Sequence, residues 1–231
     1  MILICNVSVH VSPNIWLQEL ADNIGKPFWE EDPKLWDDVN VVGLKNNYFC
    51  SVYAARMMVP QKNGLIINIS SLGAVRYMFN VCYGVGKCAV DRMSADMAIE
   101  LRDHNVTVIS LWPGIVKTEL FGSFIGSGKF DSIKDAELLK SLPQETPEFS
   151  GKAVIALATD PQRAKKTGKA ILAADVGVDY KFKDIDGSEP GSLRAVKSWF
   201  SATGYQTLAY YTPSWLRVPT WVMTFLSSRL Q

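Results

Sequence analysis

Several residue types and patterns that direct function are scarce or absent in this 231-residue sequence. The only two histidines, His10 and His104, lie far apart, which argues against a metal site or a histidine-dependent catalytic triad. Four cysteines occur without a CxxC pair, so we expect free thiols in a reducing, intracellular compartment. The 24 basic and 23 acidic residues give a net charge of +1, and this balance argues against a nucleic-acid-binding protein.

Membrane-spanning and secretory signals are also missing. No apolar run reaches the roughly 18 residues that a transmembrane helix needs. The first lysine is Lys26, so the start of the chain has no basic region typical of a secretory signal. We therefore expect a protein in the cytoplasm or on the cytoplasmic face of the endoplasmic reticulum membrane. With 48% hydrophobic and 20% charged residues, the composition is that of a globular protein with a core.

The hydrophobic periodicity predicts alternating strands and helices. Apolar runs predict buried strands over residues 2–5, 65–70, 106–112 and 170–174. Helical spacing predicts one helix from Asp32-Pro33 to Pro60, a second through Val85 to Leu101, and a short one over 150–159. Residues 6–31 and 118–146 read as mostly irregular. This order predicts an α/β fold with a parallel sheet and right-handed crossovers.

The second helix carries a tyrosine and a lysine four residues apart, Tyr83 and Lys87. Residues at this spacing share one face of a helix. A free tyrosine has a pKa of about 10, and a neighbouring ammonium lowers the pKa by stabilising the phenolate. Such a tyrosine can exchange a proton with a carbonyl or alcohol oxygen. A lone YxxxK is a weak signal, because a packed tyrosine and a solvated lysine match it equally well.

Three neighbouring segments strengthen the signal. The serines of Asn68-Ile69-Ser70-Ser71 end one predicted strand, and Pro113-Gly114 ends the next. In parallel sheets, sites form at the carboxyl ends of strands. Asn40 lies inside the first long helix, where asparagine is unfavourable; it faces either a functional group or a packed kink.

Together, Asn40-Val41-Val42-Gly43, the serine pair, the YxxxK and Pro113-Gly114-Ile115-Val116-Lys117-Thr118 resemble, in order and spacing, the short-chain dehydrogenase/reductase (SDR) family. The resemblance runs from about residue 26 to the end. It implies that Tyr83 is the general acid/base, and that Lys87 lowers its pKa and contacts the nicotinamide ribose. Ser71, or alternatively Ser70, would bond the substrate carbonyl. Asn40 would hold a water that links Lys87 to solvent.

The resemblance also implies a cofactor site and a lid. Pro113, Gly114, Val116 and Thr118 would join Tyr83 and Lys87 in binding the nicotinamide end of NAD(P)H, with NADPH slightly favoured. Residues 119–146 would form the lid over the substrate.

The glycine-rich TGxxxGxG turn of the family, which receives the pyrophosphate, does not occur in the sequence. We therefore expect a partial, Rossmann-like doubly wound sheet, corresponding to the C-terminal part of the family fold. Residues 1–25 are a divergent N-terminal segment, 26–180 a truncated catalytic domain, and 181–231 a C-terminal extension. This chain alone should bind the cofactor weakly or not at all.

The C-terminal extension is rich in aromatic residues and poor in charge. It either docks on the body of the protein or makes a peripheral membrane contact through residues 205–231. The apolar lid residues favour a small hydrophobic carbonyl substrate, steroid-like or lipid-like: Leu120, Phe121, Phe124 and Ile125.

Two functional hypotheses remain. The first is an NAD(P)H-dependent carbonyl reductase or alcohol dehydrogenase. The alternative is a non-catalytic chain that pairs through its two long helices with a full-length paralogue. Both are compatible with a homo-oligomer or a heterodimer.

Overall fold

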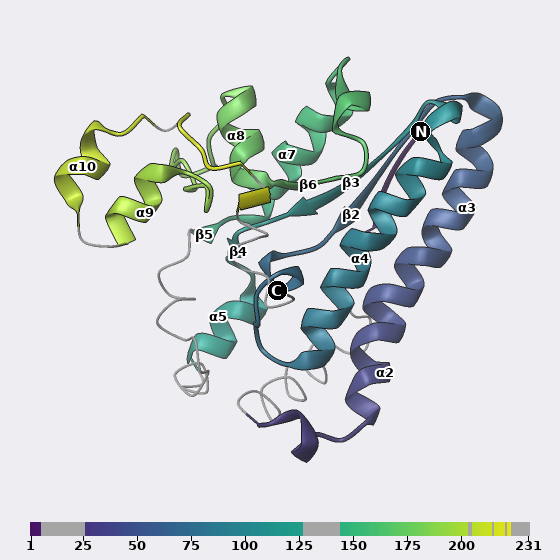
Figure 1. The fold of residues 1–231 in the computed structure, drawn as a ribbon, viewed down its shortest axis with the longest axis horizontal. Coiled ribbons are helices and arrows are strands. Elements are labelled where there is room, and N and C mark those ends of the chain that lie inside the picture. Colours follow the sequence, from purple (N-terminus) through teal and green to yellow (C-terminus); the bar gives the residue numbers. More distant parts are fainter. Residues whose placement is uncertain (6–25, 127–143, 203–204, 214, 220, 223–231) are drawn as a thin grey trace.

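The computed structural model describes residues 1–5, 26–126, 144–202, 205–213, 215–219 and 221–222. Its centre is a four-stranded parallel sheet in the order β1-β2-β3-β6, with helices on both faces (Figure 1). This arrangement confirms the predicted α/β, Rossmann-like fold. The strands of the central sheet are β1 (Ile2–Cys5), β2 (Gly64–Ile69), β3 (Val106–Trp112) and β6 (Lys169–Leu172).

The remaining elements surround this sheet. A second, two-stranded parallel sheet pairs β4 (Ile115–Val116) with β5 (Gln144–Glu145). The helices are α2 (Lys34–Asn40), α3 (Asn46–Gln61), α4 (Val81–Glu100), α5 (Glu119–Gly126), α7 (Pro147–Thr159), α8 (Ala173–Tyr180), α9 (Val196–Ala202) and α10 (Gln206–Tyr211), with a π-helical segment, Val41–Lys45, between α2 and α3.

Alternate residues of β2 and β3 enter two separate cores, because successive side chains of a strand point to opposite faces. Leu65 and Ile67 pack with α7 and α8 residues such as Phe149 on one face. Ile66 and Val108 pack on the other face with α3 and α4 residues, which include Met58, Ala54 and Ala98. Burial on both faces explains why β2 and β3 are uninterrupted apolar runs.

The first strand forms as predicted, but it is not buried. β1 is an edge strand of the sheet, and it pairs with β2 from Ile2 opposite Leu65. Leu3 packs with the α3 and α4 core. Ile2 and Ile4 point to the other face and are about half exposed, at 51% and 48%.

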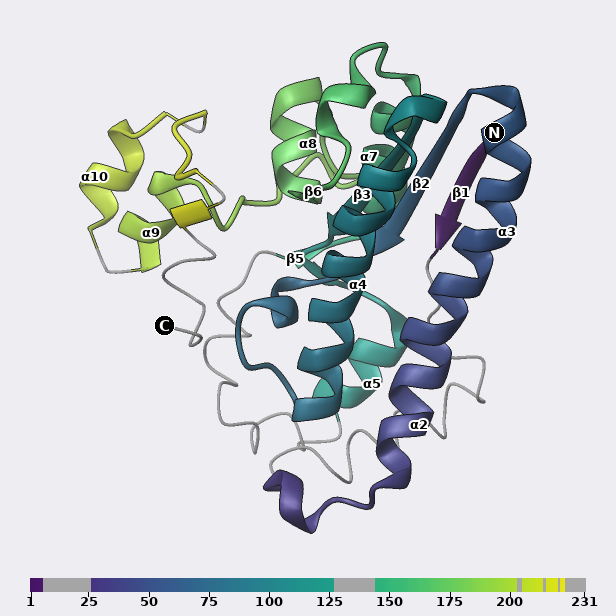
Figure 2. The same ribbon diagram turned by 45° about the vertical axis from the view of Figure 1, so that its right-hand side comes forward.

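The long helices form as predicted, but their most buried faces are not the apolar stripes of the sequence. On α4, Val85 is 44% exposed, and the buried residues are mostly small: Gly86, Ser94 and Ala98, together with Val90. Small residues let α4 approach the sheet and α2 closely. Figure 2 shows α3 and α4 side by side along one flank of the molecule.

The boundaries of three other elements differ from the sequence reading. Pro60 lies within α3 rather than ending it. The short helix α7 begins three residues earlier than expected, because Thr146 caps it by accepting a hydrogen bond from the Phe149 backbone NH. The last strand ends at Leu172, and Ala173 already begins α8, which the sequence analysis did not predict.

The C-terminal helices α9 and α10 lie at one side of the body (Figure 1). Large aromatic side chains are exposed there, among them Tyr210, Tyr211 and Trp221. Residues 223–231 lie outside the described part of the chain. The predicted docking or membrane contact of the aromatic C-terminal extension can therefore be compared with the structure only up to residue 222. Among the described helices, none combines the length and apolarity needed to cross a bilayer.

Candidate active site

Most of the candidate site residues from the sequence lie where β2 and β3 end. Both strands run in the same direction, so Ser70-Ser71 and Pro113-Gly114 emerge at the same edge of the sheet. Helix α4 begins beside this edge and carries Tyr83 in its first turn. The Asn80 side chain caps the helix by accepting a hydrogen bond from the Tyr83 backbone NH at 2.9 Å.

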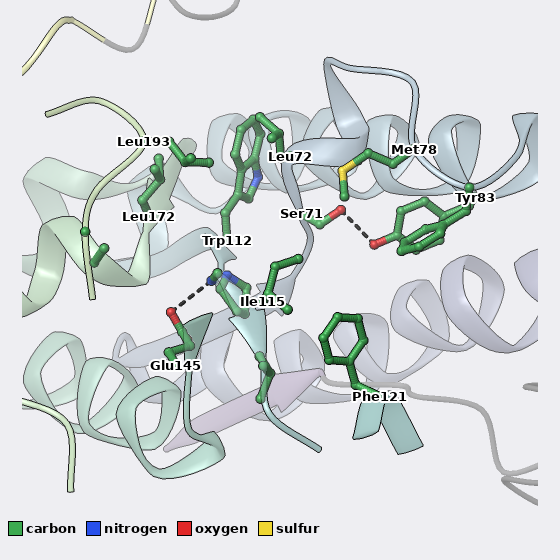
Figure 3. A pocket seen from close by; sticks show the side chains of 16 residues that line it. Ser71, Leu72, Met78, Tyr83, Trp112, Ile115, Phe121, Glu145, Leu172 and Leu193 are labelled. Atoms are coloured by element: carbon green, nitrogen blue, oxygen red, sulfur yellow. Dashed lines mark hydrogen bonds between the residues drawn. The ribbon is translucent and has the colours of Figure 1, made fainter. Parts of the chain in front are cut away.

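Ser71 and Tyr83 are hydrogen-bonded through their hydroxyls, at 2.9 Å (Figure 3). The Ser71 Oγ also accepts a hydrogen bond from the Gly73 NH at 3.0 Å, which fixes the serine rotamer. Gly73 has a further role, because a Cβ there would lie 2.5 Å from the Tyr83 ring. The loop after β2 therefore holds both hydroxyls together.

Ser70, the alternative to Ser71, points elsewhere. It is 2% exposed, and its hydroxyl donates a hydrogen bond to the Lys87 carbonyl oxygen at 3.1 Å. Ser71 lines the cavity described below, and Ser70 is not among the cavity-lining residues. The geometry thus favours Ser71 for contact with a substrate.

Lys87 lies one turn after Tyr83, as the spacing requires. Its Nζ donates a hydrogen bond to the Ile69 carbonyl oxygen at 3.2 Å and lies 5.8 Å from the centroid of the Tyr83 ring. Burial lowers the pKa of Lys87 to about 8, although the carboxylate of Asp91 opposes this shift.

The pKa of Tyr83 is shifted in the direction opposite to the sequence expectation. Burial raises the pKa of the Tyr83 phenol above its usual value, and the hydrogen bond from Ser71 only partly offsets this. The Lys87 ammonium, one turn away, donates its hydrogen bond to the Ile69 carbonyl oxygen. In this arrangement Tyr83 keeps its proton at neutral pH.

Asn40 ends α2 and is 5% exposed. Its Nδ2 donates a hydrogen bond to the Cys82 carbonyl oxygen at 3.3 Å, and its Oδ1 lies against Gly86. Asn40 therefore contacts the same turn of α4 as Tyr83, and no direct bond to Lys87 forms. The π-helical turn that follows explains how a buried asparagine is accommodated within a long helix.

Ser71 and Tyr83 open onto a cavity of about 160 Å³. Three residues expected at the nicotinamide, Pro113, Gly114 and Val116, line this cavity. Most of its other lining residues are apolar: Leu72, Met78, Phe79, Trp112, Ile115, Phe121, Leu172, Ala174 and Leu193.

Among the described residues of the predicted nicotinamide contacts and lid, Thr118 and Ile125 do not line the cavity. Thr118 caps α5, since its Oγ1 accepts a hydrogen bond from the Phe121 NH at 3.1 Å. Of the predicted apolar lid residues, Phe121 lines the cavity and Ile125 is 44% exposed. The Leu120 and Phe124 side chains, and residues 127–143, lie outside the described part of the structure.

Glu145 is a site residue that the sequence analysis missed. It is fully buried, and its carboxylate accepts a hydrogen bond from the Gly114 NH at 2.9 Å (Figure 3). It also accepts one from the Ser150 hydroxyl at 2.5 Å. Burial raises the pKa of Glu145, and these two hydrogen bonds counteract the shift. Glu145 thus fixes the Pro113-Gly114 turn from the strand β5, and no local pattern around it points to this role.

Asp91 is a second missed residue, one turn beyond Lys87 on α4. Its Oδ1 accepts hydrogen bonds from the Ser110 hydroxyl at 2.5 Å and from the Trp112 indole NH at 3.0 Å. Burial raises the pKa of Asp91, and the donors around it, with Lys87, oppose that shift. Spacing alone could have found Asp91, because it continues the four-residue series of Tyr83 and Lys87.

These residues fit the nicotinamide and ribose end of a dinucleotide. Lys87 offers a buried ammonium for hydroxyl groups, and the turn at residues 113–116 offers backbone groups on one cavity wall. In the described part of the chain, no glycine-rich turn opens a helix in the way that pyrophosphate binding requires. The residues present therefore fit one half of the cofactor.

Comparisons with known proteins agree with this geometry. The profile of the family described as "short chain dehydrogenase" matches residues 2–125. Dehydrogenase/reductase SDR family member 1 of Homo sapiens is 45% identical over 221 residues, which cover 92% of this chain and 69% of the human protein. The Mus musculus protein of the same name is 45% identical over 225 residues, with the same coverage.

Solved structures show the same fold. ElxO with NADP bound aligns with a TM-score of 0.59 and 23% identity, over 74% of this chain and 64% of that chain. The 4-hydroxyisoleucine dehydrogenase complexed with NADH aligns with a TM-score of 0.58 and 21% identity, over 74% of this chain and 65% of that chain. The chain thus spans less than two thirds of the length of either structure.

Proposed function

Because the chain belongs to the short-chain dehydrogenase/reductase family, we propose that it reduces the carbonyl group of a small apolar substrate with NAD(P)H, or oxidises the corresponding alcohol. The family is that of NAD(P)-dependent oxidoreductases, and the substrate class is our inference from the apolar cavity. The observation that carries the proposal is the hydrogen bond between the Ser71 and Tyr83 hydroxyls at the cavity surface.

Each residue of the site has a definite task in this reaction. The Ser71 and Tyr83 hydroxyls converge, so one carbonyl oxygen can contact both of them. Ser71 donates a hydrogen bond that positions the oxygen, and Tyr83 transfers its proton to that oxygen. Lys87, one turn away, stabilises the phenolate left on Tyr83. A bound nicotinamide cofactor supplies the hydride that the carbonyl carbon receives.

The pKa shifts indicate how the reaction depends on pH. The raised pKa keeps Tyr83 protonated at neutral pH, which suits it to donate a proton in the reductive direction. Lys87 loses its charge as the pH rises through about 8 and can then no longer stabilise a phenolate. We expect ketone reduction to be fastest below this pH and to fall above it; a rate that rises through pH 8 would contradict this assignment.

The test is ketone-dependent oxidation of NADPH, followed by its near-ultraviolet absorbance. Because the sequence carries no pyrophosphate-binding turn, the purified chain should bind cofactor weakly, so NADPH and NADH are each titrated to about millimolar concentration. Acetophenone serves as a small apolar ketone. A folded chain that oxidises neither cofactor faster with acetophenone than without any ketone would refute the proposal.

A second candidate function rests on the exposed flank of α3 and α4. Large apolar side chains there are unusually exposed, including Tyr53 at 63%, Met57 at 52% and Val85 at 44%. We propose that this flank pairs with a second chain of the same family, either another copy or a full-length paralogue. Sedimentation equilibrium of the wild type and of Val85→Glu tests the homodimer, and the charged variant should be monomeric.

A further inference from the structure

The C-terminal segment, described over residues 190–202, 205–213, 215–219 and 221–222, contributes two residues to the cavity that Ser71 and Tyr83 line. Gly191 and Leu193 line this cavity, although they follow Tyr83 by more than a hundred positions. In Figure 3, Leu193 lies at the same end of the view as Leu172 and Trp112, and Tyr83 lies at the other end. In this view, Leu193 thus belongs to the end of the cavity opposite Tyr83, and Ser71 lies between them.

A buried carboxylate on α8 holds this segment in place. Asp175 is 2% exposed, and it accepts a hydrogen bond from the Ser192 hydroxyl at 2.7 Å. It also forms ion pairs with Arg194 at 2.6 Å and with Arg217 at 3.1 Å. Arg217 pairs in addition with Asp179 on the same helix. Residues on both sides of Leu193 are therefore fixed by one carboxylate.

The two parts of the segment that contact Asp175 are also joined to each other. The Val218 NH donates a hydrogen bond to the Arg194 carbonyl oxygen at 2.8 Å, and the Arg194 Nε donates one to the Val218 carbonyl oxygen at 2.8 Å. The Val196 NH donates to the Leu216 carbonyl oxygen at 3.1 Å. This pairing makes the backbone around Leu193 a supported element rather than a loose end.

The ion pairs and hydrogen bonds of Asp175 favour a fixed position for the cavity wall that contains Leu193. Two guanidinium groups and two carboxylates balance in charge, and charge-assisted hydrogen bonds are the stronger class. Removing the carboxylate from a buried pair leaves uncompensated charges, which is strongly unfavourable. The position of Leu193 should therefore respond directly to a change at Asp175.

We infer that Leu193 contacts the substrate and determines how large an apolar ketone the site accepts, and that Asp175 is the positioning residue that holds Leu193 in the wall. This inference rests on the proposed function. A leucine in this wall fills the end of the cavity beyond Trp112, so its truncation makes room for a longer apolar group. The C-terminal segment then acts as the size filter of the active site.

The experiment compares acetophenone with its two-ring analogue, acetonaphthone, in the wild type, Leu193→Ala and Leu193→Phe. We expect Leu193→Ala to raise the ratio of kcat/KM for acetonaphthone over acetophenone about tenfold, and Leu193→Phe to lower it. Lys197→Ala is the matched control, because Lys197 is exposed and does not line the cavity. Its ratio should equal that of the wild type.

Asp175 is tested by two variants of different severity. Asp175→Asn should shift the same ratio toward that of Leu193→Ala and speed trypsin cleavage after Arg194 and Lys197. Ser192→Ala removes one hydrogen bond, leaves both ion pairs, and should give a smaller shift in the same direction. Circular dichroism checks that both variants are folded. If either folded variant has the same kcat/KM ratio as the wild type, Asp175 does not position Leu193.

Binding measured without turnover separates this inference from the proposed function. Ligand-observed NMR gives the dissociation constants of the two ketones for the wild type and Leu193→Ala. If the wild type binds the ketones without reducing them, the proposed function fails, and the ratio of dissociation constants decides the role of Leu193. An unchanged ratio in Leu193→Ala, or no binding of either ketone to the wild type, would overturn the inference.

Discussion

Gly86, in the middle of the YxxxK sequence, offers a sharp test of how α4 is seated. An alanine Cβ at this position would lie 2.2 Å from the Oδ1 of Asn40, a distance that real atoms do not tolerate. Asn40 is 5% exposed and hydrogen-bonded to Cys82, so its side chain has little room to move away. We therefore predict that Gly86→Ala displaces Asn40.

The magnitude follows from three contributions. Replacing a glycine by alanine within a helix is favourable by about 1 kcal/mol. Displacing Asn40 leaves buried polar groups without partners, which costs about 1–3 kcal/mol. Forcing an extra methyl group into a packed contact costs about 1–3 kcal/mol more. Together these contributions should lower the free energy of unfolding of Gly86→Ala by about 1–5 kcal/mol.

Gly84, two residues earlier on the same helix, is the matched control. The atom nearest to an added Cβ at Gly84 is the Gly73 carbonyl oxygen at 3.5 Å, an ordinary contact. Gly84→Ala should therefore keep only the favourable helix contribution and stabilise the protein by up to about 1 kcal/mol. Urea unfolding followed by circular dichroism measures both variants. If Gly86→Ala is as stable as Gly84→Ala, Asn40 of α2 does not pack closely against Gly86 of α4.

Three further predictions concern other regions. Burial alone would raise the pKa of Asp160, but its hydrogen bonds from Lys166, Tyr180 and a backbone NH lower the pKa to about 2. Asp160→Asn should therefore destabilise the protein above about pH 4, the pKa of aspartate in the unfolded chain. The difference in urea-unfolding free energy between the wild type and Asp160→Asn should disappear as the pH falls toward about 2. A difference that stays constant with pH would contradict the ion pair between Asp160 and Lys166. Glu145→Ala should cost about 1–3 kcal/mol in the same assay, because the Gly114 NH loses its acceptor, and Glu145→Gln should cost less. We also propose that the exposed aromatic surface of the C-terminal helices contacts membranes, so Trp215→Ala should reduce co-sedimentation with anionic vesicles; equal sedimentation would exclude this contact.

Much of the central fold could be predicted because its signals are local. The run from Val106 to Trp112 is the strand β3 with the same boundaries, since a β-branched apolar run buried on both faces has few alternatives. Tyr83 and Lys87 share a helix face because the helical period requires it. Asn40 stood out because asparagine is unfavourable inside a helix, but which group it contacts was not readable from the sequence.

The rest of the site depends on contacts between segments distant in the sequence. Glu145 reaches Gly114 only because β5 pairs with β4, and both strands are two residues long. Leu193 lines the cavity, and its two sequence neighbours, Ser192 and Arg194, both contact Asp175 on α8. The raised pKa of Tyr83 depends on the burial of its phenol, which does not follow from the four-residue spacing.

The measurement that tests the account most directly is the rate of ketone-dependent NADPH oxidation by Tyr83→Phe beside the wild type. Phenylalanine keeps the ring against Gly73 and removes only the hydroxyl that donates the proton. We predict a loss of about 10²–10⁴-fold in kcat with the fold intact. Tyr53→Phe, which removes an exposed hydroxyl away from the cavity, should retain the wild-type rate. Turnover by Tyr83→Phe at the wild-type rate would contradict the assignment of Tyr83 as the proton donor.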